Sequence, residues 1–550
     1  MKTINGNLFR EMLASGAANL NNHHQEIDAL NVFPVPDGDT GTNMSMTFNN
    51  GTENALNSGA EKINELSKLL SKGLLMGARG NSGVITSQIF RGFYQAIKES
   101  DEITVLELAD ALENGAKIAY KAVMKPVEGT ILTVIREASW YAKRYVEDNP
   151  NTSIEEFMQK FIDLANESLD STPELLPVLK EVGVVDSGGK GLVVIFEGFM
   201  AAINGEPIQL TENSQETHEE QVQVAMESEE YGYCTEFIIK LNNEYLNTFN
   251  ENKLRSKLSE LGDSLVVVQD EEIVKVHVHT LTPGDALNIA QRYGEFLKLK
   301  IENMQEQHEN IISDSNNSIV DVHDEENNNE YKEYALVTVC AGSGLEKIFK
   351  EYRVDKVISG GQTMNPSTED FIAAIENINA KEIFILPNNS NIILAAKQAE
   401  SIIEDKNVHV IETKSIAEGL SACIMFNPDD TVENNINEMT SAKSRVTTGQ
   451  VTYAIKDTTF EGLEIKKDDY MGLLNRKIVI SLPTKMETIK SLLTMMMENE
   501  DAEILTVISG EEATDEENAE IVEFVEQNSD LEIDLQKGDQ PVYSYIFGLE

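Results

Sequence analysis

The residues best suited to chemistry in this chain are two carboxylates one position apart, Asp37 and Asp39, which flank Gly38 in the stretch Asn31–Met44. Paired carboxylates on a tight glycine turn offer hard oxygen ligands for Mg²⁺, which completes its shell with waters and substrate phosphate oxygens. Two prolines precede the pair and stiffen the loop. For this short pattern alone, an Asp-Gly turn that caps a helix is the alternative interpretation.

Three glycine-rich segments later in the chain could bind phosphate, because free backbone N–H groups and the positive end of a helix dipole attract anions. They are Gly77–Gly83, Lys125–Thr130 and Gly183–Gly191. We expect helices to follow them from Ser82, Ile131 and Leu192. Taken singly, each segment also fits a glycine that ends one helix before a polar residue caps the next. None is a Walker A loop, since Gly191 stands where Ser or Thr is required.

Composition limits the classes of partner. The chain has 550 residues, with 44 Lys and Arg against 94 Asp and Glu, so its formal net charge is −50. This charge disfavours nucleic acid and anionic membrane surfaces. The three cysteines, Cys234, Cys340 and Cys423, lie far apart and form no disulfide framework. With no apparent signal peptide and no apolar run near ~18 residues, we expect a cytoplasmic protein without integral membrane contact.

Two acidic, amide-rich stretches, residues 206–228 and 305–332, have too few large apolar residues to form a core and are predicted to be linkers. They divide the chain into domains at 1–205, 229–304 and 333–550. Apolar residues recur at three- and four-residue spacing in the first domain, which predicts an all-α bundle or closed helical barrel. The last domain alternates strands and helices, which predicts an α/β fold with parallel strands.

The middle domain reads as strand, helix, two strands, helix and strand, the βαββαβ order of an α+β ferredoxin-like fold. Alternation in the strand that contains Val274, Val276 and Val278 places His277 and His279 together on its other face. Two histidines at this spacing form half of a metal site, which Cys234 could extend from a neighbouring strand. Exposed histidines beside a buried cysteine are the alternative. Glu236, His308 or water would supply a fourth ligand.

The motifs NVFPVPDGDTGTNM, GARGNSGVI, KPVEGTILTV and VVDSGGKGL, in this order, resemble the nucleotide-binding L subunits of dihydroxyacetone kinases. Over its whole length the chain resembles the ATP-binding subunits of bacterial fatty acid kinases. The resemblance implies an eight-helix barrel that binds Mg-ATP at one end, a zinc site in the middle domain, and a DegV-like C-terminal docking domain. It also implies a homodimer that phosphorylates the carboxylate of a fatty acid presented by a separate DegV-type fatty-acid-binding protein. The acyl phosphate product would serve phospholipid synthesis.

The matched motifs assign roles to individual residues by resemblance. Asp37 and Asp39 match catalytic magnesium ligands, and Asn31 is the nearest counterpart of a third aspartate, with an amide in its place and one extra residue in between. The zinc ligands are Cys234, His277 and His279. The residues matched to phosphate and nucleotide contacts are Thr40, Asn43, Gly80, Asn81, Ser82, Gly83, Thr130, Asp186 and Gly188. Arg79 is the nearest cation, expected to offset charge on the transferred group, with an ordinary salt bridge as the alternative.

A carboxylate acceptor is already a nucleophile, so phosphoryl transfer to it requires positioning and charge neutralisation rather than a general base. Because Asn31 stands where the resemblance gives a third aspartate, a non-catalytic nucleotide-sensing scaffold is the alternative function. A self-contained dihydroxyacetone kinase is disfavoured, because that family pattern requires a separate subunit with a covalent histidine.

Overall fold

The computed structural model describes residues 1–32, 38–211, 331–361, 364–498 and 502–550, together with most of residues 233–303. The chain forms two compact units, one made of Met1–Leu210 with Asn329–Glu550 and the other of Thr211–Asn328. Both predicted linkers fall largely outside the described residues. None of the helices in the described ranges combines the length and apolar character that a membrane span requires.

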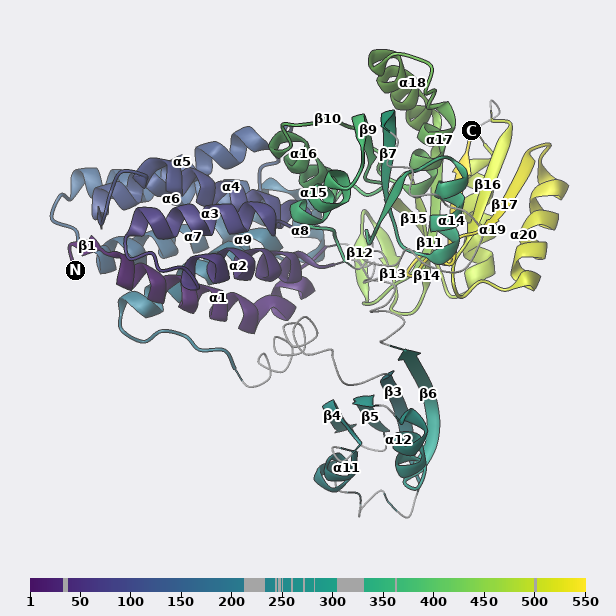
Figure 1. The fold of residues 1–550 in the computed structure, drawn as a ribbon, viewed down its shortest axis with the longest axis horizontal. Coiled ribbons are helices and arrows are strands. Elements are labelled where there is room, and N and C mark those ends of the chain that lie inside the picture. Colours follow the sequence, from purple (N-terminus) through teal and green to yellow (C-terminus); the bar gives the residue numbers. More distant parts are fainter. Residues whose placement is uncertain are drawn as a thin grey trace. The chain divides into compact units, whose positions relative to one another are not determined.

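The described part of the first 210 residues is mainly helical, as predicted (Figure 1). The described helices are α1 (Gly6–Ala29), α2 (Thr40–Leu56), α3 (Ile63–Met76), α4 (Gly80–Ile97), α5 (Val105–Ala122), α6 (Ile131–Asp148), α7 (Ile154–Leu175), α8 (Pro177–Val182) and α9 (Ser187–Ile203). A short antiparallel pair joins β1 (Thr3–Ile4) to β2 (Ile103–Thr104). From α1 to α7 each helix contacts the next, α7 contacts α9, and α9 contacts α1. These eight helices therefore close into a ring, called the helix ring below.

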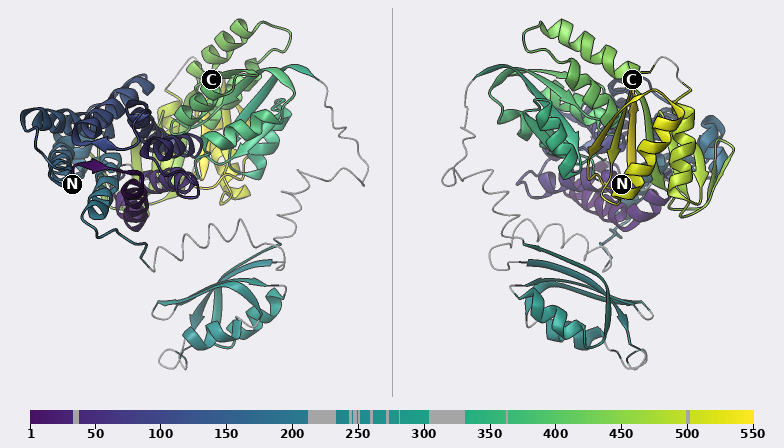
Figure 2. Two further views of the ribbon diagram at one scale, coloured as in Figure 1. Left: turned by 60° about the vertical axis from the view of Figure 1, so that its left-hand side comes forward. Right: turned by 90° about the vertical axis from the view of Figure 1, so that its right-hand side faces the viewer.

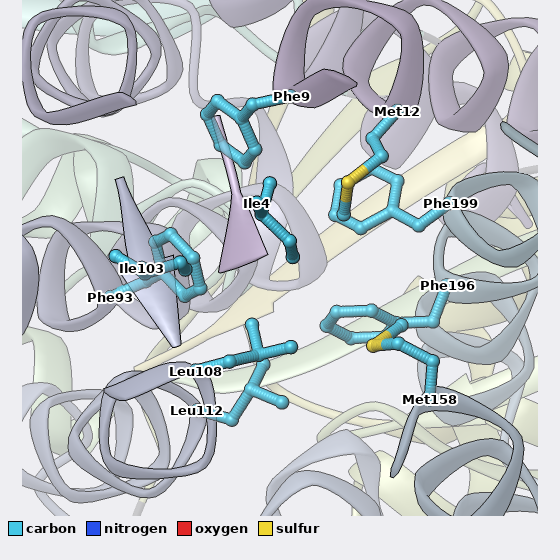
Figure 3. Close-up of a pocket in the computed structure, with 10 residues that line it drawn as sticks. All are labelled: Ile4, Phe9, Met12, Phe93, Ile103, Leu108, Leu112, Met158, Phe196 and Phe199. Atoms are coloured by element: carbon cyan, nitrogen blue, oxygen red, sulfur yellow. The ribbon is translucent and has the colours of Figure 1, made fainter. Parts of the chain in front are cut away.

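Aromatic side chains fill the interior of the helix ring. Phe90, Phe196 and Phe199 pack with ring centroids 5.4–6.4 Å apart. A cavity of about 10 Å³ lies in this interior, walled only by apolar side chains (Figure 3). That volume is close to the space of a single water, and apolar cavities stay dry. The ring interior is therefore core rather than a binding site.

Two of the helices begin earlier than the sequence indicates. We expected starts at Ser82 and Leu192, yet α4 begins at Gly80 and α9 at Ser187. Several glycines of these segments thus belong to the first helical turns, where Gly80, Gly83 and Gly191 allow close packing on α2. A Cβ on Gly191 would lie 2.6 Å from the sulfur of Met44. The predicted start at Ile131 is correct.

The described part of the C-terminal domain, residues 331–550, contains two large sheets and one two-stranded hairpin, which confirms the predicted α/β class. The first is parallel with strand order β10-β9-β7-β8, and includes β7 (Lys332–Cys340), β8 (Lys356–Ser359), β9 (Ala380–Leu386) and β10 (Asn407–Val410). Its helices are α14 (Ser343–Glu351), α15 (Thr368–Glu376), α16 (Ile393–Ile402), α17 (Ile416–Met425) and α18 (Val432–Arg445).

The second sheet of this domain is mixed, with strand order β15-β14-β11-β18-β16-β17. Its strands are β11 (Thr447–Tyr453), β14 (Tyr470–Leu474), β15 (Lys477–Leu482), β16 (Ile504–Ser509), β17 (Glu532–Lys537) and β18 (Tyr545–Leu549). Helices α19 (Lys485–Met496) and α20 (Asp515–Asn528) cover it (Figure 2). A separate hairpin of β12 (Thr458–Phe460) and β13 (Leu463–Ile465) contacts α8 of the helical domain.

The middle domain has the element order read from the sequence. It contains β3 (Tyr233–Leu241), α11 (Glu251–Leu258), β4 (Gly262–Asp270), β5 (Ile273–Thr280), α12 (Pro283–Ala290) and β6 (Gly294–Asn303). The sheet is antiparallel in the order β4-β5-β3-β6, and both helices lie on one of its faces (Figure 2). Val274, Val276 and Val278 are fully buried, as the alternation predicted.

Candidate functional site

A cleft of about 1350 Å³ separates the N-terminal ends of α2, α4, α6 and α9 from the C-terminal domain. Its walls include two of the predicted magnesium ligands, Asn31 and Asp39. They also include most residues predicted to contact phosphate or nucleotide, namely Thr40, Asn43, Asn81, Ser82, Thr130, Asp186 and Gly188, but not Gly80 or Gly83. These residues come from five separate segments, so the fold brings together the helix starts that the sequence suggested. Asp37 lies outside the described residues, and its predicted role stays a prediction.

The carboxylate of Asp39 is at the start of α2 but does not cap the helix. Asp39 occupies the N-cap position and makes no side-chain capping bond. Asp28, from α1, accepts hydrogen bonds from the backbone N–H groups of Gly41 at 2.6 Å and Thr42 at 3.2 Å, and from the Thr42 hydroxyl at 2.7 Å. Because Asp28 accepts hydrogen bonds from the Gly41 and Thr42 amides, the carboxylate of Asp39 is not required to cap α2.

The side chain of Asn31 organises the loop before α2. Its Oδ1 accepts hydrogen bonds from the hydroxyls of Thr40 at 2.7 Å and Ser187 at 3.3 Å. Its backbone oxygen accepts one from Nζ of Lys456, in the C-terminal domain, at 2.7 Å. Asn31 therefore ties the starts of α2 and α9 together, a role that the sequence did not predict.

Asn365 of the C-terminal domain contacts the candidate metal ligand directly. Its Nδ2 donates to Oδ2 of Asp39 at 2.6 Å, and the residue is only 2% exposed. No described group donates a hydrogen bond to the buried Oδ1 of Asn365. A hydrated cation held by Asp39 would supply such a donor through one of its waters, so these residues fit magnesium.

The start of α4 lies directly against α2. Gly80 has a φ of +59°, which a side chain rarely adopts, and a Cβ there would approach Nδ2 of Asn43 to 2.7 Å. The hydroxyl of Thr47 donates to the Asn43 carbonyl and accepts from the backbone N–H of Arg79. Asn43 itself is only 5% exposed. This packing brings Asn81 and Ser82, in the first turn of α4, to the same cleft as Thr40.

Arg79 is tied to the C-terminal domain. Its Nη1 donates to the carbonyl of Asn365 at 2.8 Å and lies 3.3 Å from the carboxylate of Asp370. The side chain does not line the described walls of the cleft. The salt bridge that we named as an alternative is therefore present, and contact between Arg79 and a transferred phosphate stays a prediction.

Asp186 joins two helix starts. It caps α9 by accepting from the Gly189 amide at 2.7 Å, and it also accepts a backbone hydrogen bond from Ile131 at the start of α6. Burial raises the pKa of Asp186 to about 6, partly offset by these two bonds. Thr130 precedes Ile131 and points its hydroxyl to the carbonyl of Val127 rather than capping α6.

The cleft differs in charge from the chain as a whole. Six described residues of the cleft are Lys or Arg and three are Asp or Glu, although acids outnumber bases two to one overall. The C-terminal domain supplies the basic residues Lys397, Lys414, Arg476 and Lys477. Sequence reasoning missed these residues, together with Asp28 and Asn365, because no local motif marks them.

The predicted zinc ligands lie on two paired strands. The backbone register places Cys234 opposite His279 and Glu236 opposite His277. Their side chains, and His308, are outside the described part of the structure, so the zinc site stays a prediction.

Known families match all three domains. A family model described as "DAK2 domain" matches residues 34–201. Models of the middle and C-terminal domains of FakA-like fatty acid kinase subunits match residues 230–311 and 335–550. A protein of Staphylococcus epidermidis (strain ATCC 12228) is 47% identical over 555 residues, which covers 100% of this chain and 99% of the relative. Protein YloV of Bacillus subtilis is 46% identical over 560 residues and is covered completely, as is this chain.

Solved structures give weaker likenesses. The dihydroxyacetone kinase of C. freundii matches 36% of this chain and 35% of its own, at 19% identity and a TM-score of 0.28. The fatty acid binding DegV family protein SAG1342 of Streptococcus agalactiae matches 40% of this chain and 98% of its own, at 13% identity and a TM-score of 0.28. The domain matches and the full-length relatives confirm the resemblance: this chain belongs to the FakA-like family of fatty acid kinase subunits.

Proposed function

We propose that the protein transfers the γ-phosphoryl group of ATP to the carboxylate of a fatty acid that a separate DegV-type fatty-acid-binding protein presents. One observation carries the proposal. The starts of α2, α4, α6 and α9 converge on a single cleft, with Asp39, whose carboxylate does not cap α2, on one side and a basic wall on the other. Asp28 and Asp186 accept hydrogen bonds from amides at the starts of α2, α6 and α9, whereas Arg79 makes no side-chain cap at the start of α4. The start of α4 and the nearby cations together suit a polyphosphate.

The reaction requires few catalytic groups. An oxygen of the fatty acid carboxylate attacks the γ-phosphorus and forms the new O–P bond, while the bond to the β,γ-bridging oxygen breaks and its electron pair leaves with ADP. No proton moves, so no general base is needed. Magnesium, when bound by Asp39, Asp37 and waters, would neutralise charge on the phosphate oxygens. Thr40, Asn43 and Ser82 would orient the phosphates, and the C-terminal wall would exclude water from the transferred group.

The filled core of the helix ring supports delivery of the acyl chain by another protein. Its cavity of about 10 Å³ has no room for a lipid tail. A volume of about 1350 Å³ exceeds the ~300–1,000 Å³ of a typical small-molecule site, which leaves space for ATP and an incoming carboxylate together.

The test is ³¹P NMR detection of acyl phosphate formed by the full chain, with and without a lipid-loaded DegV-type protein. We expect product only with both proteins, ATP and Mg²⁺, and none with Asp39→Asn. Nucleotide binding without acyl phosphate under any condition would contradict the kinase proposal and favour the nucleotide-sensing scaffold.

Within the same proposal, the middle domain is ferredoxin-like and binds a structural zinc ion through Cys234, His277 and His279. The strand order and the pairing of Cys234 with His279 support this assignment. Elemental analysis should find about one zinc per chain, lost in the Cys234→Ala, His277→Ala double variant. Light scattering coupled to size exclusion should give the mass of a homodimer.

A further inference from the structure

The turn between β14 and β15 brings an arginine to the cleft at a conformational cost. Leu474 pairs with Lys477, so Asn475 and Arg476 form a two-residue hairpin loop. Their φ angles are +48° and +69°, both left-handed. Loops of this type favour Asn followed by Gly, because glycine adopts a positive φ without steric penalty. An arginine in the second position is a strained choice, and such strain persists mainly at functional sites.

Hydrogen bonds hold this loop in place. The backbone N–H of Asn475 donates to the Thr448 carbonyl at 2.8 Å, and its side-chain oxygen accepts from the Thr448 amide at 2.9 Å. The Thr448 hydroxyl in turn contacts that of Ser415 at 2.9 Å, next to Lys414. Arg476 and Lys414 therefore belong to one hydrogen-bonded block at the cleft.

Three cations on this side of the cleft lack close ion-pair partners among the described residues. Among described residues, Lys414, Arg476 and Lys477 form no ion pair, and all three are exposed. The carboxylate of Glu412, on the same wall, forms an ion pair with Lys397. That bond and the charges of Lys397, Lys443 and Lys414 keep the pKa of Glu412 below its usual range. Lys414, Arg476 and Lys477 all line the cleft, so they leave positive charge there that could bind an anion.

We propose that Arg476, supplied by the C-terminal domain, is the cation that contacts the γ-phosphate of the bound nucleotide and stabilises the charge that develops on it during transfer. Lys414 and Lys477 add to the positive potential around the same oxygens. Arg79, the candidate from the sequence, is held by Asn365 and Asp370. This inference rests on the proposed function and assigns a residue to its transferred phosphate.

The test substitutes glycine for arginine in the full chain at two left-handed positions. Arg353 has a φ of +65°, is exposed, and is absent from the cleft walls, so Arg353→Gly is a matched control. Both Arg476→Gly and Arg353→Gly should leave the melting temperature unchanged or raise it, because glycine relieves the strain. Only Arg476→Gly should lower the transfer rate, by about 10²–10³-fold, and the ratio of ATP to ADP affinity, by about tenfold or more.

Arg476→Lys, which keeps the charge but loses the planar fork, should fall between Arg476→Gly and wild type in both measurements. Arg476→Gly that matches Arg353→Gly in transfer rate and in the affinity ratio would overturn the inference. If the wild-type chain forms no acyl phosphate, the kinase proposal fails. The calorimetric ATP-to-ADP affinity ratio then decides on Arg476 alone, since it requires only nucleotide.

Discussion

We expect replacement of Asn365 by Ala to weaken the binding of Mg²⁺ and nucleotide at the proposed site. The stability of the ligand-free fold should stay nearly unchanged. In the absence of ligand, the variant loses the 2.6 Å hydrogen bond from Asn365 to the Asp39 carboxylate. Hydrogen bonds to charged groups contribute about 1.5–3 kcal/mol. The variant also loses the buried Oδ1, which has no donor among described groups. An unsatisfied buried acceptor of this kind destabilises the wild-type fold by about 1–3 kcal/mol, so its removal is favourable. The two changes nearly cancel, so we expect the melting temperature of the ligand-free protein to stay within about 3 °C of wild type.

Binding of Mg²⁺ and nucleotide changes this balance. With a hydrated cation on Asp39, Oδ1 of Asn365 gains a donor and Nδ2 keeps its bond to the carboxylate, so the variant then lacks two favourable contacts. A loss of about 1.5–3 kcal/mol corresponds to a roughly 10- to 150-fold weaker Kd for a non-hydrolysable ATP analogue with Mg²⁺, measured by calorimetry.

Asn435 provides the control. It is 1% exposed, and both its side-chain atoms are hydrogen-bonded to the backbone of Asn427 at 2.8 Å. Asn435→Ala should lower the melting temperature and leave the Kd unchanged. If Asn365→Ala instead behaves like Asn435→Ala, Asn365 is an ordinary contact within the fold and the reasoning is wrong.

Three further predictions concern residues around the same cleft. Asp28→Ala should speed hydrogen exchange at the Gly41 and Thr42 amides and destabilise the start of α2 by about 1–3 kcal/mol, while Asp28→Asn, which keeps an acceptor, should lose less. Because the native pKa of Asp186 is raised, its ionisation lowers stability as pH rises from about 4 through 6; Asp186→Asn should therefore be the more stable protein at pH 8, by at most roughly 3 kcal/mol, with the difference in denaturation midpoint shrinking toward pH 5. Lys456→Met, which removes the donor to the Asn31 carbonyl, should weaken nucleotide binding several-fold with an unchanged circular dichroism spectrum; an unchanged Kd would show that this contact does not position the loop.

Local patterns in the sequence predict the parts of this protein that neighbouring residues decide. Hydrophobic spacing identified the helical first domain, and strand alternation placed Val274, Val276 and Val278 in the core. The helix starts at Gly80 and Ser187 were missed because glycine has low intrinsic helix propensity. Packing against α2 allows glycine there, and packing is not readable from the segment itself.

The chemistry of one half of the cleft was likewise present in the sequence. A carboxylate turn and three glycine-rich helix starts are local features, and their residue types alone indicate magnesium and phosphate as ligands. The other half depends on contacts between distant segments. Asn365 meets Asp39 across 326 positions, and Lys456 meets Asn31 across 425. No periodicity or spacing encodes such contacts.

The choice of cation shows this division most clearly. The sequence offered Arg79 because it stands next to a phosphate-binding segment, whereas the tertiary structure pairs that arginine with Asp370 and brings Arg476 to the cleft. Residue type and order predict a site for Mg²⁺ and phosphate. Only the packing of the C-terminal domain against the helix ring decided which charges face that site, because a side chain's partner depends on which segments meet in space.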